Sequence, residues 1–198
     1  MENGLQTMKT TSSTTDKVHP WLKGGKHSSP CLTMVAKYLC AMKVKSVLDT
    51  GCGNGDLMTT LIRLGITEVR GCDIEPDHAK IARTRTKRPV AAKAFYDENP
   101  YPAQTYDAVV AINWLHNDWE FRHATGISKK VENSKRLSRV IKALEDSGAK
   151  FFIWDWRDEG ANKMVRILVK NGWKQQAALT LPRDKRAKNL IYVYKKED

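Results

Sequence analysis

The sequence predicts an α/β fold: a three-layer α/β/α sandwich around a seven-stranded, mostly parallel sheet. From residue 30 onward, stretches typical of buried strands alternate with amphipathic helical stretches. The last two strand-like stretches follow one another without a helix between them. Alternation gives parallel strands with helices on both faces, whereas two strands joined by a short loop form an antiparallel hairpin. The last strand is therefore expected to run against the other six.

The individual elements follow from residue patterning. Ser29 is a suitable helix cap and Pro30 a suitable first helical residue, so a helix is expected over 28–42. Further helices are expected over 56–64, 76–85, 134–146 and 161–170. Strands are expected over 45–50, 67–74, 90–96, 106–113, 149–156, 173–181 and 189–195.

Length and composition indicate one domain in a reducing compartment. Residues 1–18 are rich in Ser and Thr without apolar periodicity, which predicts a disordered tail, and residues 19–198 are expected to form a single domain. The N-terminus lacks the pattern of a signal peptide and no apolar run is long enough to cross a membrane. The four cysteines match no zinc or redox spacing. We therefore expect a cytoplasmic protein without membrane partners.

The stretch "VLDTGCGNGD", Val47 to Asp56, places three glycines between the first sheet strand and the next helix. Parallel sheets bind ligands at this end of their strands. The spacing G-x-G-x-G is one residue shorter than the dinucleotide fingerprint G-x-G-x-x-G. Asp49 stands just before the turn and would repel a pyrophosphate. The turn is therefore better suited to a ligand with a positively charged amino group.

This stretch resembles the first motif of the class I S-adenosylmethionine-dependent methyltransferases, and "VRGCDIEP" resembles the second. The segment 94–113 is similar to the family's passage from strand three to strand four, and the closing hairpin is similar to its reversed seventh strand. The resemblance implies a Rossmann-like methyltransferase fold with S-adenosylmethionine as cofactor. It implies that Asp73 binds the ribose hydroxyls and that Ile74 packs on the adenine. The other implied cofactor residues are Asp49, Gly51, Cys52, Gly53, Gly55, Asp97 beside the adenine amino group, and Asn113 near the methionine part.

The stretch after strand four, "NWLHNDWEF", offers a candidate base. "WLHNDWE" is similar to the "LHDW"-like segment of small-molecule O-methyltransferases, which implies that His116 is a general base. The match contains one extra residue, Asn117, and the alternative is a histidine that only shapes the pocket through local hydrogen bonds. Trp114 is either a stacking platform for a flat acceptor or a core residue.

The net charge of +12 fits either an anionic partner or a solvated lysine-rich surface, so the position of the charge must decide. On the predicted fold, Arg157 and the hairpin loop with Arg183, Lys185 and Arg186 lie on the ligand side, and they are candidate substrate contacts. The run Arg83–Arg88 is expected at the amino end of the sheet, away from the site, as a solvated surface, with a docking patch as the alternative. The basic rim favours RNA, DNA or a phosphorylated or carboxylated small molecule as substrate.

Together these features predict methyl transfer to an oxygen or nitrogen of an acidic or aromatic acceptor. The chain lacks an N-P-P-Y motif and a Pro-Cys pair after strand four, which disfavours methylation of DNA base amino groups and of cytosine carbon. The absence of a large cap indicates an open site for a macromolecule or a site that a protein partner completes. The alternative is a catalytically silent subunit that binds the cofactor or nucleic acid. No metal ligand set is expected.

Overall fold

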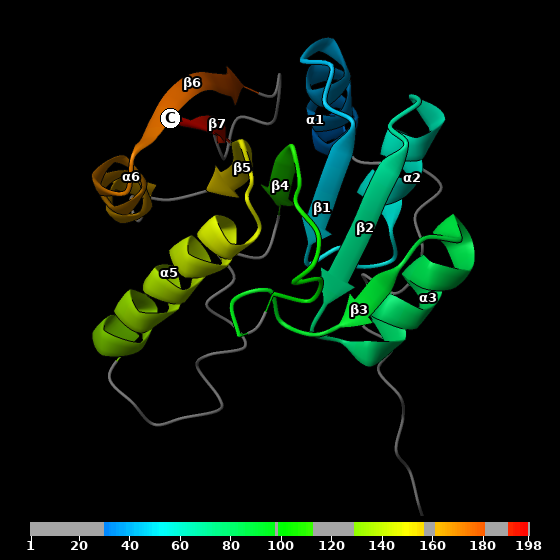
Figure 1. Ribbon diagram of the computed structural model, residues 1–198, viewed down its shortest axis with the longest axis horizontal. Coiled ribbons are helices and arrows are strands. Elements are labelled where there is room, and N and C mark those ends of the chain that lie inside the picture. The colour runs from blue at the N-terminus through cyan, green and yellow to red at the C-terminus, as the bar shows by residue number, and fades with distance from the viewer. Residues whose placement is uncertain (1–29, 98, 113–128, 157–160, 181–189, 198) are drawn as a thin grey trace, which may run out of the picture.

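A computed structural model describes residues 30–97, 99–112, 129–156, 161–180 and 190–197 of the chain. These residues form a sheet with helices on both faces (Figure 1). The strands are β1 (Ser46–Thr50), β2 (Glu68–Asp73), β3 (Val90–Ala92), β4 (Ala108–Ala111), β5 (Phe151–Trp156), β6 (Trp173–Thr180) and β7 (Leu190–Lys196). The helices are α1 (Pro30–Ala41), α2 (Asp56–Arg63), α3 (Pro76–Thr86), α5 (Lys129–Asp146) and α6 (Ala161–Lys170).

The strand order is β3-β2-β1-β4-β5-β7-β6. The pairs from β3 to β5 are parallel, and β7 is antiparallel to both β5 and β6. This confirms the predicted mostly parallel, seven-stranded sheet with a reversed last strand. From β1 the chain adds β2 and β3 on one side of the sheet and then continues with β4 and β5 on the other side. The direction in which strands are added therefore changes between β1 and β4. Ligands of such sheets bind at the carboxyl edge beside this point.

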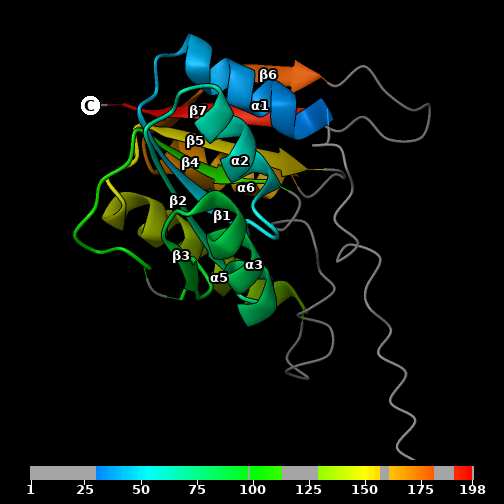
Figure 2. The same cartoon turned by 90° about the vertical axis from the view of Figure 1, so that its right-hand side faces the viewer.

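The two faces of the sheet are covered by different helices. Successive residues of a strand point to opposite faces, so Val47 packs with the buried side chains of α1, α2 and α3, and Leu48 packs with those of α5 and α6. Figures 1 and 2 show these two helical layers. In α1, Val35 and Leu39 are fully buried, which contributes about 1.5–3 kcal/mol for each side chain.

Two predicted boundaries differ from the structure by more than two residues. The strand predicted for 90–96 ends at Ala92, because the chain turns back through a hydrogen bond from the Asp97 amide to the Ala94 carbonyl at 3.2 Å. Phe95 is thereby buried in the core under α5 and α6. The helix predicted from Ser134 begins at Lys129, since the upstream Lys and Glu residues also favour helix.

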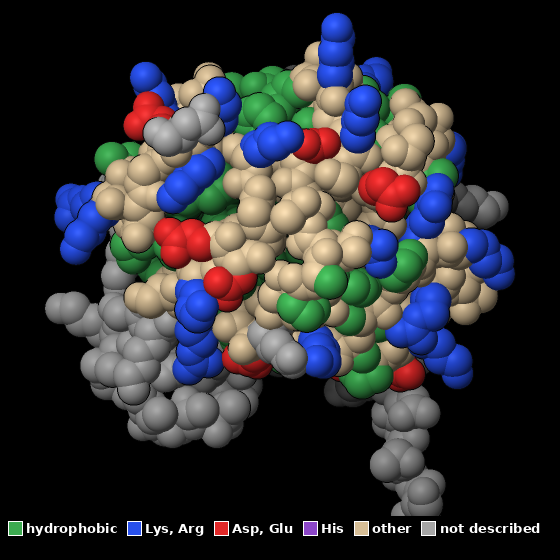
Figure 3. Space-filling view, in the orientation of Figure 1, with side chains coloured by type: hydrophobic (Ala, Val, Ile, Leu, Met, Phe, Trp, Pro, Cys, Tyr) green, Lys and Arg blue, Asp and Glu red, His purple; other side chains and the backbone are tan. Residues whose placement is uncertain are grey.

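The surface is strongly basic but mixed in sign. Figure 3 shows Lys and Arg side chains spread over one face, with Asp and Glu side chains between them. In the described part of the chain, none of the helices is long and apolar enough to cross a bilayer.

Candidate functional site

The glycine turn leaves the carboxyl end of β1 and enters α2 at Asp56. Gly55 precedes the helix with φ +79°, a conformation that L side chains rarely adopt. A Cβ at Gly55 would also lie 3.0 Å from Thr86 Cγ2 and 3.2 Å from Ala82 Cβ of α3. Glycine is therefore required here by both backbone conformation and the close approach of α3.

The first half of the turn is fixed to β2 by backbone hydrogen bonds. The Gly51 and Cys52 amides donate to the Cys72 carbonyl at 2.8 and 3.0 Å. The Gly53 amide donates to Asp73 Oδ2 at 2.7 Å, and the Glu75 amide donates to Asp73 Oδ1 at 2.9 Å. The Asp73 carboxylate thus connects the turn with the start of α3. Because a carboxylate can accept about four hydrogen bonds, Asp73 keeps capacity for ligand hydroxyl groups.

His78 is a polar neighbour of Asp73 that the sequence analysis did not single out. Its Nδ1 lies 3.5 Å from Asp73 Oδ1, and its side chain is partly exposed. The signal in the sequence was its position in the first turn of the predicted helix after Asp73.

Two buried acceptor atoms at the turn have no hydrogen-bond partner among the described residues. They are Asp49 Oδ2 and Asn54 Oδ1. Burial raises the pKa of the Asp49 carboxyl well above its usual value, and the nearby charges of Asp73 and Asp56 raise it further. A buried acceptor without a donor is costly. Both atoms therefore favour a ligand that brings hydrogen-bond donors or positive charge.

Ile74 and Asp97, both expected around the adenine, differ in their surroundings. Ile74 follows the end of β2 and leaves 47% of its surface exposed, which is available for packing against a ligand. The Asp97 carboxylate instead lies 3.1 Å from Arg139 Nη1 of α5, and both side chains are largely exposed. The structure therefore gives Asp97 a protein partner that the sequence analysis did not foresee.

The side chains of Cys52, in the turn, and Cys72, at the end of β2, are two buried free thiols. Burial raises the pKa of both well above the ordinary value, with a further rise from the charge of Asp49. A Cβ at Gly71 of β2 would come 2.7 Å from Met58 Sδ and 3.0 Å from Cys52 Sγ. The turn therefore rests on a tightly packed floor. We assign no reactive role to these thiols.

The structure corrects the expected position of Arg85. The run Arg83–Arg88 was expected away from the site, but Arg85 Nη1 contacts Asp56 Oδ1 and the Asn54 carbonyl oxygen, the latter at 3.3 Å. The expectation was wrong for Arg85 because the C-terminal end of α3 packs directly against Gly55. A basic residue predicted to be solvated is thus part of the turn's surroundings.

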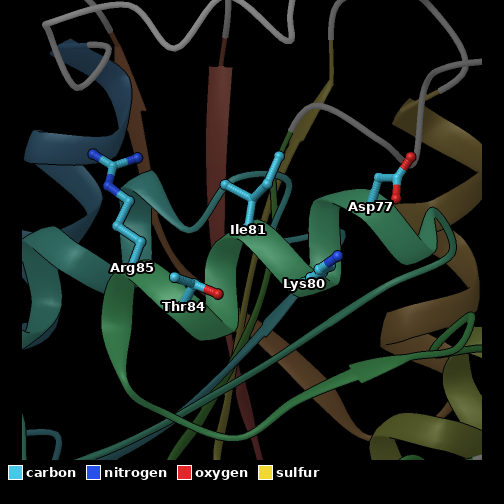
Figure 4. A pocket seen from close by; sticks show the side chains of 5 residues that line it. All are labelled: Asp77, Lys80, Ile81, Thr84 and Arg85. Atoms are coloured by element: carbon cyan, nitrogen blue, oxygen red, sulfur yellow. The ribbon is translucent and has the colours of Figure 1, made fainter.

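A surface depression of about 500 Å³ lies along the outer side of α3, next to this contact. Five side chains that project from successive turns of α3 line it (Figure 4): Asp77, Lys80, Ile81, Thr84 and Arg85. None of the predicted site residues lines this depression.

The predicted cofactor residue Asn113 and all the predicted residues on the acceptor side lie outside the described residues. They are Asn113, Trp114, His116, Arg157, Arg183, Lys185 and Arg186. The structure brings together Asp49, the three glycines, Cys52, Asp73 and Ile74 at the carboxyl edge of β1 and β2. It adds Asn54, which the pattern G-x-G-x-G did not single out because it specifies only the glycines.

Comparison with known proteins finds methyltransferases that are similar to this chain. A family model described as a methyltransferase domain matches residues 47–132. The ribosomal protein L11 methyltransferase of Janthinobacterium sp. is 36% identical over 101 residues, which are 48% of this chain and 33% of that protein. The chain thus spans about a third of that relative.

Solved structures show the same fold. The methyltransferase domain of bacterial-CtHen1-C superposes with a TM-score of 0.66 at 18% identity, over 85% of this chain and 97% of that one. Magnesium protoporphyrin IX methyltransferase from Synechocystis PCC 6803, solved with bound SAM, gives a TM-score of 0.64 at 17% identity, over 84% of this chain and 78% of that one. At these identities the likeness establishes the Rossmann-like methyltransferase fold.

Proposed function

We propose, because the chain belongs to the class I S-adenosylmethionine-dependent methyltransferase family, that it transfers a methyl group from S-adenosylmethionine to an oxygen or nitrogen of an acidic or aromatic acceptor. When bound, the cofactor supplies an electrophilic methyl group on a positively charged sulfur. The chain's own task is to hold the cofactor, align the acceptor and exclude water.

The single observation that carries the proposal is the set of acceptors at the glycine turn. Asp49 Oδ2 and Asn54 Oδ1 are buried without a donor among the described residues, and the Asp73 carboxylate is bound to the same turn through the Gly53 amide. These groups complement a ligand with an amino group and hydroxyl groups, and they oppose one with phosphate groups. A cation beside Asp49 would also lower its raised pKa, so that the carboxylate binds in its charged form.

Roles follow for the described residues. Asp49 would hold the positively charged end of the cofactor, and Asp73 would accept hydrogen bonds from the ribose hydroxyls. Ile74, whose side chain is exposed, would pack on the adenine. The burial of this apolar surface and the pairing of the open acceptors both favour binding.

Titration calorimetry with S-adenosylmethionine and with its product, S-adenosylhomocysteine, tests the cofactor role. Asp73→Asn keeps the shape of the side chain but removes its charge, so we expect about a 100-fold loss of affinity. Asp107→Asn is a matched control, since Asp107 lies before β4 at the amino edge of the sheet. Lack of wild-type binding at about 1 mM ligand, which corresponds to roughly −4 kcal/mol, would contradict the proposal.

For the acceptor, we infer an anionic molecule, either a nucleic acid or an anionic small molecule. The net charge of +12 supports this, as does the segment from Lys80 to Lys93, which holds six Lys or Arg residues and no Asp or Glu. A labelled-methyl screen against RNA, DNA, protein and metabolite fractions identifies the class. If the acceptor is a nucleic acid, its binding weakens steeply with salt. The triple variant Arg183→Ala, Lys185→Ala, Arg186→Ala should then reduce both affinity and salt dependence.

Catalysis itself is tested with His116. If His116 takes the acceptor proton, His116→Ala lowers kcat by about 10²–10⁴-fold while cofactor affinity stays unchanged. An unchanged kcat leaves His116 as a pocket residue. No methyl transfer to any fraction by a wild-type chain that binds the cofactor identifies it instead as a cofactor-binding subunit.

A further inference from the structure

We propose that Arg85 is a positioning residue that fixes the second half of the glycine turn and so raises affinity for the cofactor. This inference rests on the proposed function for its ligand and goes beyond it by adding a residue of α3 to the site. Arg85 lies 12 residues after Asp73, outside every motif of the sequence analysis.

The two halves of the turn are held differently. Gly51, Cys52 and Gly53 donate their amides to β2 and to Asp73. For residues 54–56, the bonds within the turn and α2 are local, such as that from the Gly55 amide to the Cys52 carbonyl at 2.9 Å. Among the described residues, Arg85 provides the hydrogen bonds that reach residues 54–56 from another element.

One guanidinium nitrogen of Arg85 binds two oxygen atoms in the second half of the turn. Nη1 donates to Asp56 Oδ1 at the start of α2 and to the Asn54 carbonyl oxygen. The contact depends on the close approach of α3, which places Thr86 and Ala82 against Gly55. The neighbouring residues of α3 therefore keep the base of the Arg85 side chain close to the turn.

Both residues that Arg85 binds, Asn54 and Asp56, affect the proposed ligand site. Asn54 carries one of the two open buried acceptors, so fixing its peptide orients that acceptor before the ligand arrives. Asp56 is one of the charges that raise the pKa of Asp49, and Arg85 forms an ion pair with Asp56. A site that is ordered before binding loses less conformational entropy on binding. The Arg85 and Asp56 side chains are 40% and 34% exposed, so the effect on global stability should be small.

The experiment compares binding of S-adenosylhomocysteine to wild type, Arg85→Ala, Arg85→Lys and Lys80→Ala by calorimetry. Lys80 is an exposed cation on the same helix and is a control for the loss of charge. We expect Arg85→Ala to weaken binding about fivefold and Lys80→Ala less than about twofold. Arg85→Lys should recover part of the loss, because a lysine can still pair with Asp56. In an Asp56→Asn background, Arg85→Ala should cost less than it does in the wild type.

A readout without ligand separates positioning from the proposed function. Hydrogen exchange at the Gly55 amide should be several-fold faster in Arg85→Ala than in wild type or Lys80→Ala. If the wild type fails to bind S-adenosylhomocysteine, the proposed function fails, and exchange alone decides the role of Arg85. Wild-type affinity in Arg85→Ala overturns the inference, and so does weakened affinity with wild-type exchange at Gly55, because the loss would then not come from a loosened turn. Should Arg85→Ala not fold, Arg85→Lys and Asp56→Asn are judged by the same two measurements.

Discussion

The two edges of the sheet each contain a buried or half-buried carboxyl group, but these two groups differ in their hydrogen-bond partners and in the direction of their pKa shift. At the amino edge, Asp107 accepts hydrogen bonds from the Lys45 amide at 2.9 Å, the Ser46 amide at 3.2 Å and Lys150 Nζ at 3.0 Å. Burial alone would raise the pKa of Asp107, but these donors lower it below its ordinary value. At the carboxyl edge, Asp49 has a raised pKa and an oxygen without a donor among the described residues.

The difference separates a carboxylate that stabilises the fold from one suited to a ligand. Asp107 ties together the starts of β1, β4 and β5, three neighbouring strands. Asp49 places a carboxyl group where the folded chain does not stabilise its charged form, so its ionisation costs stability and is favoured by a bound cation. The carboxyl group that lacks a hydrogen-bond donor therefore indicates which edge of the sheet binds a ligand.

The largest expected effect is at the carboxyl edge. Gly55→Ala combines a disfavoured φ with a close contact to α3, so we expect the free energy of unfolding to fall by about 2–4 kcal/mol. Cofactor binding should be lost as well. Gly53→Ala is the matched control, because its φ is +50° but an added Cβ meets nothing within 4 Å. Chemical denaturation measures both variants, and equal losses would contradict the role given to α3.

The amino edge should lose stability without losing function. Asp107→Ala removes the acceptor for two amides and one ammonium group, so we expect a decrease of about 2–3 kcal/mol in the free energy of unfolding. Affinity for S-adenosylhomocysteine should stay unchanged. Lys150→Ala removes only an exposed partner and should cost less than about 1 kcal/mol. A weakened affinity in Asp107→Ala would show that the two edges are not independent.

Asp49→Asn should stabilise the fold but weaken ligand binding, the opposite of Asp107→Ala. Since the pKa of Asp49 is raised in the folded state, the folded chain binds more protons than the unfolded chain, and this carboxyl lowers stability as pH rises. Its removal should raise the free energy of unfolding at pH 7 by about 1 kcal/mol and weaken S-adenosylmethionine binding at least about tenfold. Urea denaturation and calorimetry check the two effects. Lower stability with wild-type affinity would remove Asp49 from the ligand site.

The smallest effect is the acid response of Asp107. Its pKa is lowered in the folded state, so its contribution is present above about pH 4, the value in unfolded chains, and is lost as pH falls through the folded-state value. Between about pH 5 and pH 3, Asp107→Asn should therefore lose about 1 kcal/mol less stability than the wild type. Urea denaturation at several pH values measures this. Parallel curves for the two proteins would contradict the assigned pKa direction.

The sequence alone was sufficient to predict a seven-stranded, mostly parallel sheet with a reversed last strand, because helix and strand periods alternate clearly and the closing hairpin lacks a helix. Glycine spacing and the acids before and after it were enough to select Asp49 and Asp73. These signals are local, and each depends on a few neighbouring residues. The shortened β3 was missed because burial of Phe95 under α5 and α6 is a tertiary contact.

The role of Arg85 could not be predicted for a similar reason. Its contact depends on where the C-terminal end of α3 lies relative to Gly55, and no local pattern specifies this crossing. The ion pair between Asp97 and Arg139 likewise joins residues 42 positions apart. For His116 and the basic hairpin loop, the predictions from sequence remain predictions.

The buried Cys52 thiol can report how often the glycine turn opens. All four cysteines are free, and Cys40 on α1 is the one with appreciable exposure. A thiol-directed reagent should modify Cys40 first, while Cys52 reacts only when the turn opens, because a buried protonated thiol is inert. The modification rate of Cys52 in a Cys40→Ser background would then report how often the turn opens and how strongly each ligand closes it.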